Sequence, residues 1–101
     1  MADSREIMNA ASKAKDLLIK DRPRGEHAFD DLLKQYPFDG MIYLKRAEAW
    51  EFLEEIGLAR NDYADAARLL TMPKWKQPAE NALRRLEGIL KLKRDRDARS
   101  I

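Results

Sequence analysis

The chain contains no cysteine and only one histidine, His27. Without cysteine it has no disulfides, no thiolate metal ligands and no cysteine nucleophile. Its serines, Ser4, Ser12 and Ser100, lie in the terminal segments, whereas a serine nucleophile needs a base held beside it in a pocket. The four glycines are scattered, so the sequence has no phosphate-binding loop. We therefore expect a protein that is not an enzyme and that uses no metal or cofactor.

Long apolar runs are also missing. A membrane-spanning helix needs roughly 18 consecutive apolar residues, and no such stretch occurs. Residues 1–20 carry charges at short intervals, so they lack the apolar run of ~7–15 residues that a secretory signal needs. These absences predict a soluble, cytoplasmic protein that makes no contact with a membrane.

Neither sign of charge dominates the chain. Its 101 residues hold 20 Lys and Arg against 18 Asp and Glu, a net of +2, which does not by itself indicate a nucleic-acid partner. Hydrophobic residues make up 45%, enough to bury a core, which argues against intrinsic disorder. The length predicts a single domain over residues 1–101, at the usual ~100–150 residues per domain.

The residues that are abundant favour helices. The chain has 14 alanines and 13 leucines but no valine, which predicts an all-α fold. Apolar periodicity predicts helices at 3–20, from 23 or 26 to 35, at 40–57, from a cap at 61 or 62 to the proline at 73, and from 78 onward. Residues 91–101 are predicted to form a frayed basic tail. The 40–57 helix is apolar over most of its circumference, so we expect it in the middle, packed on two sides.

A repeat pattern runs through the centre of the chain. Trp50 is followed by Leu53, and Ala66 by Leu70, with Pro78 closing the segment. The small Ala66 lets a neighbouring helix approach, and the larger side chains fill the space around it. Residues 47–80 resemble the tetratricopeptide repeat (TPR) in this order of large, small and closing residues. The resemblance implies stacked antiparallel helical hairpins, a TPR-like α-solenoid of about five helices.

The resemblance also places a turn and shows two departures. Tyr63, after Asn61 and Asp62, is similar to the Gly-Asp-Tyr turn of the family, so a hairpin turn is expected there. Glu54 stands where the repeat prefers glycine, and Gly57 where it prefers tyrosine. The flanking helices match only parts of a repeat.

An acidic ridge, formed by Glu48, Glu51 and Glu55, lies on the 40–57 helix at three- and four-residue spacing, in line with Met41 and Leu44. The first helix of each TPR hairpin lines the concave groove of the stack. The resemblance therefore implies that this ridge faces a groove, where a basic or amphipathic partner segment would bind.

Internal pairing is the alternative for the same carboxylates. Glu51 and Glu55 repel each other at i, i+4 spacing, so a compensating cation is expected. Arg84 or Arg85 of the last helix would supply it, and we favour this pairing because surface ion pairs are common. Trp75, in a predicted loop at 72–77, either covers helix ends or belongs to an exposed contact patch.

Charge is distributed unevenly along the chain. Residues 74–101 hold nine Lys and Arg against four Asp and Glu, whereas residues 38–73 hold four against seven. This asymmetry favours head-to-tail or antiparallel self-association, including a homodimer. It also permits nucleic-acid binding by the last helix, but acidic residues dilute the 91–99 run and no aromatic is present there for base stacking.

Together these patterns predict a non-enzymatic protein–protein interaction module, an adaptor or scaffold that binds a partner segment in a helical groove. The candidate partner-binding residues are Met41, Leu44, Glu48, Glu51, Glu55, Trp75, Arg84 and Arg85. The alternative is a nucleic-acid-associated helical protein that uses its basic C-terminal helix.

Overall fold

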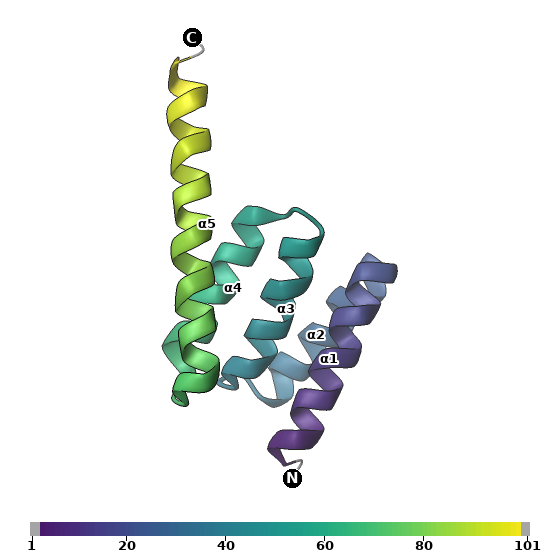
Figure 1. The fold of residues 1–101 in the computed structure, drawn as a ribbon. Helices are drawn as coiled ribbons and strands as arrows, with labels where there is room; N and C mark the ends of the chain where they lie inside the picture. The colour runs from purple at the N-terminus through teal and green to yellow at the C-terminus, as the bar shows by residue number, and fades with distance from the viewer. Residues whose placement is uncertain (1–2, 100–101) are drawn as a thin grey trace.

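The computed structural model describes residues 3–99, and over that range every regular element is a helix. In chain order the helices are α1 (Ser4–Lys20), α2 (Arg22–Gln35), α3 (Gly40–Phe52), α4 (Ile56–Leu69) and α5 (Pro73–Arg99). Figure 1 shows them as an elongated array in which α5 extends beyond the other four. The prediction of an all-α fold is confirmed for the described residues. Among these helices, none combines the length and apolar character needed to cross a membrane.

The first three helices begin at aspartate caps. The Asp3 carboxylate accepts a hydrogen bond from the Glu6 backbone N–H at 2.9 Å, and Asp39 accepts one from Met41 at the same distance. Asp21 alone separates α1 from α2, and its side chain accepts from the N–H of Arg24 at 3.4 Å. This one-residue connection folds the two helices back on each other as a hairpin.

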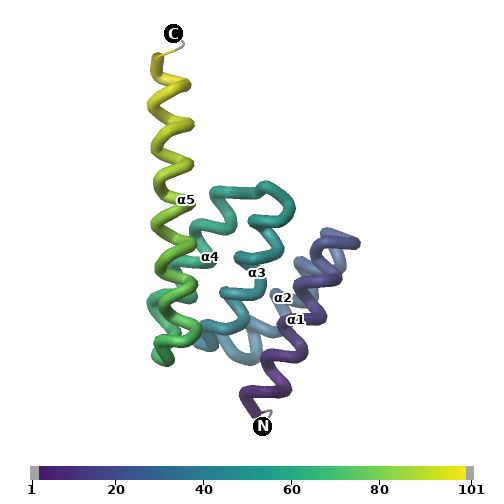
Figure 2. The backbone as a smooth tube through the Cα atoms, in the orientation of Figure 1, coloured from purple at the N-terminus to yellow at the C-terminus, as the bar shows by residue number. Residues whose placement is uncertain are grey.

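Helix α3 lies at the centre of the array. It packs against α1 on one side and α4 on the other and touches α2 only slightly, while α5 packs on α4. Figure 2 shows the same order of helices along the backbone. The expectation that this helix is packed on two sides is therefore confirmed. Trp50, near the C-terminal end of α3, is buried. The largest fully buried side chains of the core come from four helices and are Leu18, Phe29, Ile42 and Leu86.

The boundaries of the middle helices differ from those predicted. Helix α3 ends at Phe52 rather than at residue 57, and Phe52 is 69% exposed although the helix was expected to be apolar over most of its circumference. The turn lies at residues 53–55, where Glu54 adopts a φ of 61°. The predicted turn and cap at Asn61 and Asp62 were wrong, because both residues lie inside α4. The 47–80 repeat thus begins in the middle of α3, and Trp50 lies near the C-terminal end of that helix.

Helix α5 begins earlier and continues further than predicted. Pro73 opens it instead of ending α4, Pro78 lies within it, and Trp75 is in its first turn rather than in a loop. The helix also continues through Arg99, where a frayed tail was expected; the last two residues of that tail lie outside the described residues. Lys76 donates from its Nζ to the carbonyls of Ala67 and Leu70, so α5 supplies a cap for the C-terminal end of α4.

Candidate functional site

The acidic ridge is centred on Glu51, whose carboxylate joins three helices. It accepts hydrogen bonds from the Arg85 guanidinium of α5, with Nη2 at 3.1 Å from Oε1, and from the Tyr63 hydroxyl of α4 at 2.8 Å. The bond from Arg85 lowers the pKa of the Glu51 carboxyl, because it stabilises the charged form. Burial and the bond to Glu51 together raise the pKa of Tyr63. The predicted internal pairing of the ridge with Arg85 is therefore confirmed.

The other two carboxylates of the ridge are also paired. Glu48 lies 3.2 Å from the Lys15 ammonium of α1 and 3.5 Å from that of Lys45. Glu55 lies 3.6 Å from a guanidinium nitrogen of Arg22. Each acid of the ridge thus has a cation of its own molecule beside it.

The remaining residues assigned to the ridge are placed elsewhere. Met41 and Leu44 are 8% and 4% exposed, so both belong to the core. Arg84 donates to Asn81 of its own helix at 2.9 Å rather than to α3. The acidic ridge is consequently a set of contacts between helices, and the structure offers no bare acidic face there.

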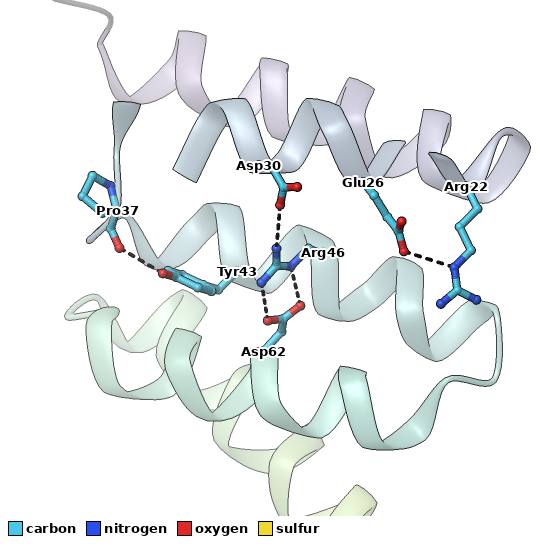
Figure 3. A network of polar contacts seen from close by, with 7 residues as sticks. All are labelled: Arg22, Glu26, Asp30, Pro37, Tyr43, Arg46 and Asp62. Atoms are coloured by element: carbon cyan, nitrogen blue, oxygen red, sulfur yellow. Dashed lines mark hydrogen bonds and ion pairs between the residues drawn. The ribbon is translucent and has the colours of Figure 1, made fainter. Parts of the chain in front are cut away.

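A second polar network lies on the other side of α3 (Figure 3). Arg46 donates from Nε and Nη2 to the two carboxylate oxygens of Asp62 on α4, at 2.7 and 2.9 Å, and its Nη1 is 4.0 Å from Asp30 on α2. Asp62 is only 5% exposed. Burial raises the pKa of its carboxyl, and the Arg46 guanidinium opposes that rise. The pair holds α3 to α4 and brings α2 alongside.

This network lines a hollow of about 450 Å³ between α2 and α4. The charged groups around the hollow pair with neighbours of this chain: Glu26 with Arg22 at 3.2 Å, and Asp65 with Arg68 at 3.3 Å. The Arg22 guanidinium also lies 4.8 Å from the centre of the Trp50 ring. The hollow therefore presents charges that are already matched, which suits a structural role better than ligand recognition.

An apolar pocket of about 290 Å³ lies at the other end of α3. It lies where the start of α1, the α2–α3 connection and the α4–α5 connection meet. Most of its lining is apolar, and polar groups come from Ser4, Asp39 and Thr71. The apolar residues are Met8, Phe38, Gly40, Met41, Leu69, Leu70, Met72 and Trp75. Phe38 and Met72 are 77% and 58% exposed, and Trp75 is half-buried. Large apolar side chains exposed together around a hollow are typical of a site that binds another molecule.

Close packing gives the pocket a firm floor. A Cβ atom on Gly40 would lie 2.8 Å from Cγ of Leu70, so the end of α4 rests directly on the start of α3. Lys74 places its ammonium 5.1 Å from the centre of the Trp75 ring. Two of the predicted partner-binding residues, Met41 and Trp75, thus come together here, although the sequence placed them in separate features.

Sequence reasoning missed Phe38 and Met72 as surface residues of a site. Each is a large apolar residue beside a proline in a connection between helices, Pro37 before Phe38 and Pro73 after Met72. Residues in a connection between helices do not belong to the apolar face of either helix. A large apolar side chain at such a position is therefore the signal that could have located the pocket.

Comparison with known proteins adds no assignment to these sites. No protein-family model matches the chain, and neither does any curated protein or solved structure with which it was compared. Within residues 3–99, no three histidine, aspartate or glutamate side chains gather so as to hold a metal ion.

Proposed function

We propose that this protein is a non-enzymatic interaction module whose apolar pocket binds a large apolar side chain of a partner segment. The observation that carries the proposal is the exposure of Phe38 and Met72, 77% and 58%, at the edge of a hollow that also contains Trp75. Exposed apolar groups around a pocket mark binding surfaces, and tryptophan is among the residues that contribute most to binding energy at interfaces.

The chemistry of the pocket favours a protein segment over a polar small molecule. Among the residues that the structure describes, Asp39 is the one charged group of the lining, and it already accepts the Met41 N–H at 2.9 Å; Ser4 and Thr71 add two hydroxyl groups. Three methionines, Met8, Met41 and Met72, form much of the wall. Methionine side chains are flexible and polarisable, so they adapt to apolar groups of different shapes. The partner that fits is an amphipathic segment with one large apolar side chain.

The arrangement of helices supports a TPR-like stack as the scaffold. Helix α3 begins 36 residues after α1, and α5 begins 33 residues after α3. These intervals lie close to the ~34-residue TPR period. On this proposal α1–α2 and α3–α4 are two stacked hairpins, and α5 is the first helix of a third unit.

The test is a selection of binding peptides from a random library displayed on phage, followed by measurement of their affinity. We expect the selected peptides to share one large apolar residue. The Phe38→Asp variant should bind them at least about tenfold more weakly, because a charge then lies at the edge of the pocket. Phe52→Asp is the matched control, since Phe52 is also exposed but lies at the opposite end of α3. Equal losses for the two variants, or no loss for either, would contradict the proposal.

One observation favours the alternative of nucleic-acid binding. Helix α5 continues through Arg99, and its side chains from Lys91 onward are exposed. A salt titration separates the two functions, because binding to phosphates weakens steeply as salt rises. If neutralising Lys91, Lys93 and Arg94 made that salt dependence shallower, the alternative would replace the apolar pocket as the functional site.

A further inference from the structure

The C-terminal half of α5 projects past the helices that support its first half (Figures 1 and 2). Leu86 is the last fully buried residue of this helix. Beyond it, Ile89 and Leu92 are 43% and 71% exposed, although both are large and apolar. A helix that leaves apolar side chains bare along a projecting segment is incomplete without something packed against it.

The projecting half and the start of α4 form a concave step. One hollow of about 410 Å³ is lined by Ile56, Leu58, Ile89 and Leu90, together with Glu54, Glu55 and Lys93. A second hollow of about 550 Å³ continues from it along α5 and is lined by Ile89, Leu92, Lys93, Asp95, Arg96 and Arg99. Leu58 is 40% exposed in the step, so apolar surface extends from one helix to the other.

The two sides of the step carry opposite charge. Glu54 and Glu55 lie at the α4 side, with the Arg22 guanidinium 3.6 Å from Glu55, so Glu54 is the acid of this side that has no cation beside it among the described residues. Lys93, Arg96 and Arg99 lie along α5, where Asp95 and Asp97 reduce but do not cancel the positive charge of residues 93–99. Because α5 projects, the arm of one copy can enter the step of the other, and an acidic side, an apolar middle and a basic side then match those of a copy turned by 180°. This self-complementarity is what a two-fold symmetric interface requires.

We propose that a second copy of this chain occupies the step and forms a two-fold symmetric dimer. In this dimer Leu92 of each copy packs against Leu58 and Ile89 of the other, and the basic end of each α5 reaches Glu54 of the other. The surface is distinct from the apolar pocket, which lies at the opposite end of α3 and α5, so the dimer does not depend on the proposed function. Few apolar side chains take part, so the dimer is concentration-dependent rather than obligate.

The first test is sedimentation velocity of the full chain over a series of concentrations. We expect the wild type to pass from monomer to dimer as concentration rises. Leu92→Asp should raise the dissociation constant of the dimer at least about tenfold, because each dimer contains the substituted position twice. Met72→Asp is the matched control: Met72 is 58% exposed but lies in the apolar pocket. A wild type that stays monomeric, or a dimer lost with Met72→Asp and kept with Leu92→Asp, overturns the proposal.

The second test uses charge reversal and mixing. One variant carries Glu54→Lys, and the other carries Lys93→Glu and Arg99→Glu; circular dichroism establishes that both keep their helices. Each variant alone should lose the dimer, because like charges then face each other at both contacts. An equal mixture should dimerise, since each reversed side meets a side of opposite sign on the other copy. If the mixture stays monomeric while the wild type dimerises, the proposed pairing of charges is wrong.

Discussion

Gly25 occupies the closest approach between α1 and α2. A Cβ atom at this position would lie 2.1 Å from Cα of Leu18 and 2.4 Å from its backbone nitrogen. Backbone atoms inside a helix cannot move aside as the end of a side chain can, so only glycine fits here. At Gly88 on α5, by contrast, an added Cβ would meet nothing within 4 Å.

The two glycines should therefore respond in opposite ways to alanine. Gly25→Ala should lower the free energy of unfolding by about 1–3 kcal/mol, because the added methyl group forces the two helices apart. Gly88→Ala should raise it by up to about 1 kcal/mol, because glycine is unfavourable within a helix and the site is open. Urea denaturation followed by circular dichroism measures both. A Gly25→Ala variant as stable as the wild type would show that α1 and α2 do not approach this closely.

Some helix ends were predictable from the sequence because their cause is local. Asp3 and Asp39 cap their helices through bonds to residues two or three positions later, and such spacing is visible in the sequence. Asp62 is also an aspartate that could cap a helix, but it lies inside α4. Its carboxylate accepts a hydrogen bond from Arg46, 16 residues earlier in the chain, rather than from a backbone N–H of its own helix. The actual start of α4 has no side-chain cap, and Glu54 forms the turn before it without glycine. Nothing local therefore marked the true boundary.

The pair between Arg46 and Asp62 connects α3 to α4 and is expected to be strongly coupled. Arg46→Met should cost about 3–5 kcal/mol of stability, because it leaves the Asp62 carboxylate buried without a cation. Combining it with Asp62→Asn should restore most of that loss, since the amide carries no charge to leave buried. A double-mutant cycle, completed by Asp62→Asn alone, measures the coupling. Strictly additive losses would contradict it.

The bond between Glu51 and Arg85 connects α3 to α5 and should make stability depend on pH. Because this bond lowers the pKa of Glu51 in the folded protein below its ordinary value of 4.5, the carboxylate stabilises the fold above that value. The contribution is lost as pH falls through the lower, folded pKa. Glu51→Gln should therefore melt below the wild type at pH 7, and the difference should shrink in acid. Thermal unfolding across the acid range measures it; a constant difference would exclude this origin.

At the scale of the whole molecule, the sequence predicted the class of fold and the central position of α3 more reliably than the site. The composition and periodicity that define a helix are local, whereas the apolar pocket joins residues from the start of α1, the α2–α3 connection and the α4–α5 connection. Met41 and Trp75 were singled out separately, and only the packing of α3, α4 and α5 brings them together. Only part of the pairing of the acidic ridge was predicted, for the same reason: its cations Lys15, Arg22 and Arg85 come from three other helices.

The projecting half of α5 should be dispensable for folding, because the core ends before it. Deleting the chain from residue 92 onward removes, within the described range 92–99, only exposed side chains, so the free energy of unfolding at low protein concentration should fall by less than about 1 kcal/mol. Deleting from residue 86 onward also removes Leu86, which is 0% exposed, and should cost at least about 2–5 kcal/mol. Urea denaturation of the two shortened chains measures both. If the two shortened chains lost similar amounts of unfolding free energy, residues 92–99 would have to pack against the body of the protein, and the prediction would be wrong.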